Sequence, residues 1–283
     1  MKRLIVTGDD FGLAEPVNEA IEEAHVNGIL TTASLMVGAP ASRDAVARAK
    51  RIPSLRVGLH LVLVEGKPVL PSASIPALVD KNGEFSTRLA EAGFRFFLLP
   101  GVRRQLEAEI RAQFQAYRTT GLPLDHANGH NHMHLHPTVL SLVLKVGREF
   151  GLAAVRVPYE PPLRSWRMSR RFLVSRLAAS LSLTPWTGLM RTRLRRQKLR
   201  CNDFVFGMFD TGAMTTEQTL RVIGRLPDGV TEIYFHPATR RCPEIDRAMP
   251  EYRHEQELAA LTSPLVKEAL QAANIERISF GDL

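Results

Sequence analysis

The sequence predicts an α/β fold, most simply an irregular (β/α) barrel of the TIM-barrel type that carries a basic amphipathic helical insertion. Short apolar runs alternate with helix-like segments along the chain, which is typical of a parallel sheet with helical crossovers. Acidic residues and histidines directly follow several apolar runs, where barrel enzymes place their chemistry. One segment, 161–202, interrupts this alternation with eleven basic residues and no acidic one.

The size and composition predict a single domain over residues 1–283, with the basic insertion at 161–202 inside it. The sequence contains no run of about 18 apolar residues, so no transmembrane helix is predicted. The first residues lead straight into a strand-like run, without the apolar segment and cleavage site of a signal peptide. Two cysteines, Cys201 and Cys242, are too few for a disulfide framework, so a reducing cytoplasm is expected.

The first strand, residues 4–7, leads into the adjacent carboxylates Asp9 and Asp10. Adjacent side chains in a regular strand point to opposite faces, but a turn at the strand end can bring both into one site. Alternatively, one aspartate could cap the helix expected over 17–24, which should end at Gly28.

A second strand is predicted over 32–37, a helix over 42–50 and a third strand over 55–63. His60 lies near the end of that third strand. A lone histidine in an apolar strand is usually a satisfied core residue, but other candidate ligands in this chain favour a functional role. Residues 67–100 contain prolines and turn signals, and we expect a long functional loop there.

An amphipathic helix is predicted over 102–117, with Glu109 on its outer face. Residues 122–127 lead into a row of alternating histidines, and Pro137 begins the next helix. A further strand is expected at 154–158. After the basic segment we expect the strands and helices at 204–207, 216–224, 231–237, 258–273 and 278–280.

The histidine row consists of His130, His132, His134 and His136. In an extended chain these side chains would share one face. Imidazole is the commonest protein ligand for divalent metals near neutral pH, so the row favours a metal or catalytic site. A solvated polar loop, or histidines that cap the helix at Pro137, is the alternative.

The basic segment combines arginines with aromatic and leucine residues at near-helical spacing, a pattern typical of interfacial membrane helices. We expect Pro185 to split it into two short helices. The alternative is a solvated surface insertion with a small core of its own. The residues expected to contact a membrane or a lipid tail are Trp166, Arg170, Arg171, Trp186, Arg195 and Arg196.

Five segments in this order resemble the YdjC-like family of carbohydrate deacetylases: 8–13, 31–37, 58–68, 129–134 and 235–238. Within that family, residues 125–137 are most similar to the hopanoid-biosynthesis-associated branch. Asn128 stands where the family usually has an aspartate, which would change the electrostatics beside the metal.

The resemblance implies a metal held by Asp10, His60 and His130, with Asp9 as the general base and His236 as the general acid. Three protein ligands leave open positions for water and substrate, as a catalytic metal requires. The cofactor expected from one carboxylate and two imidazoles is a divalent cation, with Zn²⁺ favoured and Mg²⁺, Co²⁺, Ni²⁺ or Mn²⁺ as alternatives. His132, His134 and Asn128 are expected to support these ligands or contact the substrate.

The function that these features predict is removal of the acetyl group from an N-acetylglucosaminyl hopanoid glycolipid, with the enzyme peripheral on the inner face of the cytoplasmic membrane. Deacetylation of soluble N-acetylated oligosaccharides is the nearest alternative. A non-catalytic protein that binds a metal or anionic lipid is another. The slightly acidic remainder of the chain argues against a nucleic-acid partner. An oligomer is compatible with the sequence, which predicts no particular oligomeric state.

Overall fold

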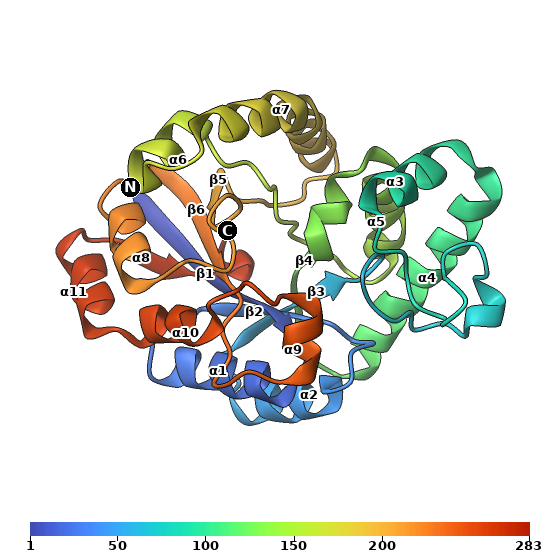
Figure 1. Ribbon diagram of the computed structural model, residues 1–283, viewed down its shortest axis with the longest axis horizontal. Coiled ribbons are helices and arrows are strands. Elements are labelled where there is room, and N and C mark those ends of the chain that lie inside the picture. Colours follow the sequence, from blue (N-terminus) through green and yellow to red (C-terminus); the bar gives the residue numbers. More distant parts are fainter.

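The computed structural model describes residues 1–283 and contains a parallel sheet surrounded by helices (Figure 1). The strand order is β4-β3-β2-β1-β6-β5, and β7 pairs with the first half of β1. Residues 4–11 of β1 are all buried, as expected for the central strand of a sheet covered on both faces. The strands are β1 Lys2–Phe11, β2 Thr32–Leu35, β3 Arg56–Leu61, β4 Leu124–Gly129, β5 Phe204–Phe206, β6 Gly229–Phe235 and β7 Glu276–Ile278.

The sheet curls beyond its two outer strands, β4 and β5. The backbone N–H of Ala127 donates to the Ala154 carbonyl over 3.0 Å, and the N–H of Val155 donates to the Arg200 carbonyl over 3.0 Å. The strand predicted at 154–158 is therefore an extended segment held by single bridges. These bonds extend the sheet from β4 through the segment 154–158 toward β5, so the sheet curls around. This arrangement confirms the predicted irregular, TIM-barrel-like α/β fold.

The helices predicted around residues 17–24, 42–50, 102–117, 137–150 and 216–224 are confirmed within a few residues. Those helices are α1 Glu15–Val26, α2 Ser42–Arg51, α4 Pro100–Thr119, α5 Pro137–Glu149 and α8 Thr216–Ile223. No helix combines the length and the apolar composition that a membrane span requires. The remaining helices are α3 Leu89–Leu98, α6 Pro162–Ser169, α7 Leu173–Arg196, α9 Pro243–Ala248, α10 His254–Thr262 and α11 Pro264–Ala272, with short 3₁₀ turns η1 Ser72–Ser74, η2 His130–Leu135 and η3 Phe280–Asp282.

Several local predictions were wrong. The loop expected over 67–100 contains α3, and the single helix expected over 258–273 is two helices that meet at Pro264, which cannot continue the first one. Glu109 faces inward and is fully buried, because its carboxylate accepts the backbone N–H groups of Val69 (2.9 Å) and Leu70 (3.0 Å). It therefore ties the loop after β3 to α4.

The histidine row does not adopt the extended conformation that would place its side chains on one face. It forms the 3₁₀ turn η2, in which Asn131 (φ 51°) and His132 (φ 53°) adopt the left-handed conformation. The four histidines therefore point in different directions and do not share one face.

The basic insertion is helical, but Pro185 does not split it, since Pro185 lies inside the continuous helix α7. The break falls at residues 170–172, where Arg170 and Phe172 have positive φ values. Met190 and Leu194 of α7 are buried in the main apolar core. The insertion therefore packs into the core of the barrel, and the alternative of a surface insertion with a small separate core is wrong. Figure 1 shows α7 lying along one side of the barrel.

Candidate metal and catalytic site

The two adjacent aspartates reach one site through an irregularity in β1. The pairing of β1 with β2 shifts register between Gly8 and Phe11, and Asp10 has a φ of 60°. This bulge breaks the normal alternation of side chains, so Asp9 and Asp10 both face the carboxyl edge of the sheet. Neither caps α1, whose N-cap is Ala14 without a side-chain cap. The capping alternative is therefore wrong.

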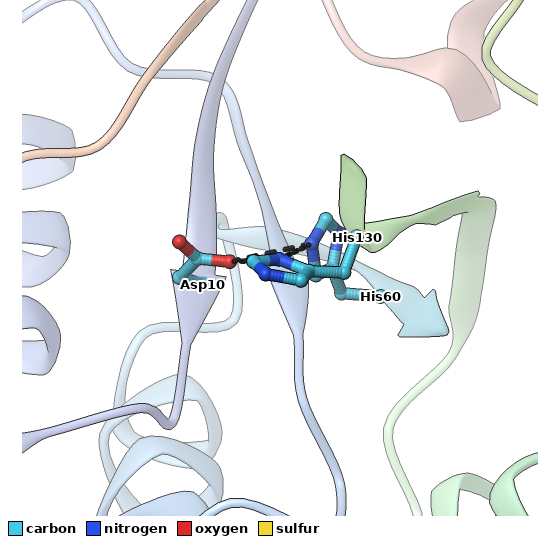
Figure 2. A group of neighbouring side chains, drawn as sticks. All are labelled: Asp10, His60 and His130. Atoms are coloured by element: carbon cyan, nitrogen blue, oxygen red, sulfur yellow. Dashed lines mark hydrogen bonds and ion pairs between the residues drawn. The ribbon is translucent and has the colours of Figure 1, made fainter. Parts of the chain in front are cut away.

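Asp10, His60 and His130 converge from the ends of β1, β3 and β4 (Figure 2). Asp10 Oδ1 lies 3.3 Å from His60 Nε2 and 3.3 Å from His130 Nδ1. The two ring nitrogens lie 3.4 Å apart. The structure thus brings together the three residues that were expected to hold the metal.

The three residues fit a divalent cation. Both carboxylate oxygens of Asp10 are buried and accept no hydrogen bond, which is costly for an ionised group without a cation. Donor atoms about 2.0–2.1 Å from a tetrahedral metal lie about 3.3–3.4 Å apart, close to the observed spacing. The donor set of one carboxylate and two imidazoles suits Zn²⁺ and related transition metals.

Asn128 fixes the orientation of His60. The Nδ1–H of His60 donates to Asn128 Oδ1 over 2.7 Å, which leaves Nε2 free to face Asp10. The Asn128 amide in turn donates to Ser34 Oγ (2.9 Å) and to Asp9 Oδ1 (3.3 Å). An amide at position 128 therefore connects a candidate ligand with the candidate base.

Glu65 faces the other imidazole. Its Oε2 lies 4.0 Å from His130 Nε2 and accepts a hydrogen bond of 2.6 Å from the Asn131 side chain. Burial alone would lower the pKa of His130, but the Asp10 carboxylate, with a smaller contribution from Glu65, outweighs it and raises that pKa. The sequence showed Glu65 only as part of a matched segment, without a role.

Asp9 is held by Arg156, a residue that sequence reasoning missed. The guanidinium donates to both Asp9 oxygens (2.6 and 3.0 Å) and to both Glu232 oxygens (2.6 and 2.9 Å). Burial would raise the pKa of Asp9, but the Arg156 charge outweighs it and holds that pKa far below its usual range. A charged residue among the valines of 154–158 was the available signal, because a buried arginine requires carboxylate partners.

His236 follows β6, and its backbone N–H donates to Glu257 Oε2 over 2.6 Å. Its Nδ1 is buried without a hydrogen-bond partner, and its ring packs against Tyr252. Burial lowers the pKa of His236 to about 4, although Asp10 and Asp9 oppose the shift. The imidazole is therefore mainly neutral near pH 7.

The other histidines of the row do not contact the candidate ligands. His132 Nε2 lies 3.2 Å from the Tyr234 hydroxyl, and His134 donates from Nε2 to the Arg156 carbonyl over 3.0 Å. His136 packs edge-on against Phe96 and Phe97 of α3. That His132 and His134 support the metal ligands or contact the substrate stays a prediction. In this structure His134 contacts Arg156 directly, and His132 contacts Tyr234, over whose ring the Arg156 guanidinium lies.

A cavity of about 270 Å³ opens beside His130. Glu65, Lys67 and Phe85 line it from the segment after β3, and Arg247 lines it from α9, where it forms an ion pair with Glu84. The size and the mixed lining suit a sugar-sized group next to the candidate metal ligands.

The residues expected to contact a membrane lie on α6, at the turn before α7 and on α7. Arg170 lies over the Trp166 ring at 5.0 Å, and Trp186 is exposed. None of Arg170, Arg171, Arg195 and Arg196 forms an ion pair with an acidic side chain, so their charges remain available to a partner.

Comparisons with known proteins identify the family of this chain. The family model described as YdjC-like protein matches residues 3–272. A carbohydrate deacetylase of Brevibacillus brevis is 31% identical over 99% of each chain. One of Geobacillus stearothermophilus is 32% identical over 98% of this chain and 96% of the relative. A crystal structure of a proposed cellobiose-phosphate cleavage protein from Enterococcus faecalis superposes with a TM-score of 0.77 at 25% identity, covering 99% of this chain and 98% of that one.

Proposed function

This chain belongs to the YdjC-like family of carbohydrate deacetylases, and from that premise we propose that it is a metal-dependent N-deacetylase of an N-acetylglucosaminyl hopanoid glycolipid. The observation that carries the reaction type is the cluster of Asp10, His60 and His130 with Asp9 beside it. A binding site alone would need the first three residues, but it would not need a second carboxylate at the same strand end.

When bound by Asp10, His60 and His130, a divalent cation supplies a Lewis acid that polarises the acetyl carbonyl and lowers the pKa of water. Asp9 accepts a proton from the attacking water as a C–O bond forms at the carbonyl carbon. Arg156 keeps Asp9 ionised and fixes its position. The C–N bond then breaks, which yields acetate and the free amine.

His236 protonates the leaving nitrogen, because an amine anion would be a very poor leaving group. Since His236 is mainly neutral in the free protein, it must gain a proton before it can donate one. The proton that the attacking water gives up balances the one that the amine receives. The buried Nδ1 of His236 has no hydrogen-bond partner, which is consistent with such a transfer role.

The hopanoid substrate is supported by the similarity of residues 125–137 to the hopanoid-associated branch and by the basic segment 161–202. A deacetylase of soluble oligosaccharides has no evident need of such a segment. We place the protein at the anionic inner face of the cytoplasmic membrane, with Trp166 and Trp186 among the contacts. The apolar tail would stay near the bilayer while the sugar enters the cavity beside His130.

Mass spectrometry tests the substrate. The purified protein is incubated with acetylglucosaminyl hopanoid and, separately, with diacetylchitobiose. Replacement of one acetyl group by hydrogen on the hopanoid alone supports the proposal, whereas reaction of diacetylchitobiose alone would favour the soluble-sugar alternative.

The variant Asp9→Asn separates an enzyme from a metal-binding protein. The enzyme should lose turnover while it keeps its metal, as measured by elemental analysis of the purified variant. Turnover equal to that of the unchanged protein would contradict the role of Asp9 as the base.

A further inference from the structure

The exposed apolar side chains of the molecule are concentrated on two segments. Eleven of the fourteen large apolar side chains that are exposed lie on α3 with Leu99, or on α6, α7 and the turn between them. Such concentration marks an interaction surface, because scattered single residues are the ordinary pattern. The α6–α7 part belongs to the basic insertion. The other part, here named the α3 patch, consists of Phe94, Phe97, Leu98 and Leu99.

The α3 patch and α7 both border the first turn of α5. Phe96 and Phe97 of α3 pack against His136, which precedes that turn. Arg193 of α7 donates to the Pro137 carbonyl over 3.2 Å and to Ser141 Oγ over 2.7 Å. In Figure 1, α3 and α5 lie together while α7 approaches from the other side. The two segments therefore flank one short stretch of chain.

The same two segments carry an excess of positive charge. Around the α3 patch, Glu91 pairs with Arg88 over 2.9 Å, whereas Arg95, Arg103 and Arg104 form no ion pair with an acidic side chain. Residues 161–202 contain eleven basic residues and no acidic one. Without these fourteen, the chain holds 23 basic and 29 acidic residues. Apolar groups bordered by unopposed arginines match the two layers of an anionic bilayer surface, its acyl boundary and its headgroups.

The helix that carries the α3 patch directly follows a segment that lines the cavity beside His130. Phe85 and Thr87 line the cavity beside His130, and α3 begins at Leu89. On the other side of α5, α7 packs against η2, the turn that carries His130. A surface that contacts both α3 and α7 would therefore adjoin the two segments that line the cavity and carry His130.

We propose that the α3 patch is a second membrane contact, and that it acts with α7 to seat the cavity mouth against an anionic lipid surface. This rests on the proposed function only in placing a lipid-linked sugar at that mouth. Contact at two points orients the site toward the bilayer, so a headgroup sugar could reach the cavity without extraction of its apolar tail.

The test uses the double variant Phe94→Gln with Leu98→Gln, since these side chains are 70% and 62% exposed and their loss should not disturb the core. The matched control is Val26→Gln with Leu265→Gln, which are 61% and 59% exposed elsewhere. Each full-length protein is sedimented with vesicles of phosphatidylglycerol and phosphatidylcholine, and with phosphatidylcholine alone. Thermal unfolding verifies that each variant is folded.

We expect the α3 variant to bind the anionic vesicles at least about tenfold more weakly, and the control to bind as the unchanged protein does. Equal binding by the α3 variant would overturn the proposal, as would failure of the unchanged protein to bind anionic vesicles. A dimer that sedimentation equilibrium detects and that the α3 variant abolishes would also overturn it, because the patch would then be a subunit interface.

Turnover of diacetylchitobiose distinguishes this proposal from the proposed function. Retained turnover with weakened vesicle binding supports a docking role for the α3 patch. If the unchanged protein deacetylates neither diacetylchitobiose nor the hopanoid but its vesicle binding depends on the patch, the proposed function fails and the membrane contact stands.

Discussion

At the scale of single residues, Arg156 allows two carboxylates to be buried side by side. It is fully buried and pairs with both Asp9 and Glu232. Thr7 Oγ1 also donates to Glu232 over 2.6 Å, so the charged group is hydrogen-bonded at several points. Removal of one partner from such a network leaves a buried charge without a counter-charge. The stability lost in this way exceeds the net stability that the intact network contributes.

We expect Arg156→Gln to lower the free energy of unfolding by about 3–5 kcal/mol near pH 7, because Asp9 and Glu232 would lose their counter-charge. Arg156→Lys keeps the charge but loses the paired geometry, so its loss should be smaller. Urea unfolding measures both. Equal stability of the glutamine variant and the unchanged protein would show that the network is not holding these carboxylates.

Asn128→Ala should weaken metal binding by about 10–100-fold, because the His60 Nδ1–H loses its acceptor and the ring its fixed orientation. Competition with a coloured chelator measures the affinity. Asn82→Ala, in an exposed turn, is the control and should leave the affinity unchanged. Unaltered affinity in the Asn128 variant would mean that packing alone orients His60.

His134 predicts a pH dependence of stability. Burial, with the Arg156 charge, lowers its pKa to about 3 from 6.5. The unfolded chain therefore binds the proton more tightly, and stability is lost as the pH falls from about 6.5 toward about 3. Between pH 6.5 and 5 this amounts to about 2 kcal/mol.

His134→Gln should remove that part of the loss, whatever constant offset the substitution introduces. Urea unfolding at pH 7 and pH 5 provides the comparison. The glutamine variant and the unchanged protein would show the same change with pH if His134 did not contribute.

At the scale of elements, the sequence identifies most of the sheet and the residues that end its strands. Apolar runs that lead into Asp9, Asp10, His60 and His236 can be recognised from the local sequence alone, and the structure has strands there. The row at 130–136 does not, because its conformation depends on left-handed residues, Asn131 and His132, that the alternating pattern conceals. Arg156 was missed for a different reason: its partners come from β1 and β6, and only the curled sheet brings them together.

In the insertion, too, local sequence predicts the helix but not which of its residues are buried. Its helicity follows from composition, but the buried position of Arg176 depends on distant groups. Arg176 lies in α7, and its guanidinium donates to Asp210 over 2.8 Å and to Ser169 over 2.7 Å. Glu160 and Ser165 complete this contact. The start of α7 is thereby tied to the barrel, even though the sequence around it resembles a free amphipathic helix.

Arg176→Met should loosen α6 and the start of α7, because Asp210 and Glu160 would lose their buried partner. Hydrogen exchange over 162–180 is expected to speed up by at least about tenfold, while exchange in β1 stays slow. Arg167→Met, on the exposed part of α6, serves as the control. Unchanged exchange over 162–180 would show that apolar packing alone holds the insertion.

At the scale of the whole molecule, the candidate ligands join three parts of the fold. Asp10 comes from the centre of the sheet, His60 from β3 and His130 from the turn after β4. A ligand that binds only the folded state stabilises it according to its concentration relative to Kd. Metal binding should therefore stabilise the molecule as a unit.

At a free Zn²⁺ concentration about 100 times Kd, the gain should be about 2.7 kcal/mol and should raise Tm by on the order of 5–10 °C. Thermal unfolding with added Zn²⁺, and then with a chelator, measures the effect. Asp10→Asn should remove most of the response. A similar rise in Tm for that variant would place the bound metal elsewhere.

The bulge in β1 has a mechanical consequence. Had the two carboxylates come from separate strands, their spacing would have followed every sliding or twisting motion between those strands. Asp9 and Asp10 instead share one backbone, anchored on one side by β6 and on the other by β2. Relative motion of neighbouring strands therefore leaves the backbone separation of the candidate base and the candidate ligand unchanged, and tolerance to thermal distortion is built into a single peptide unit.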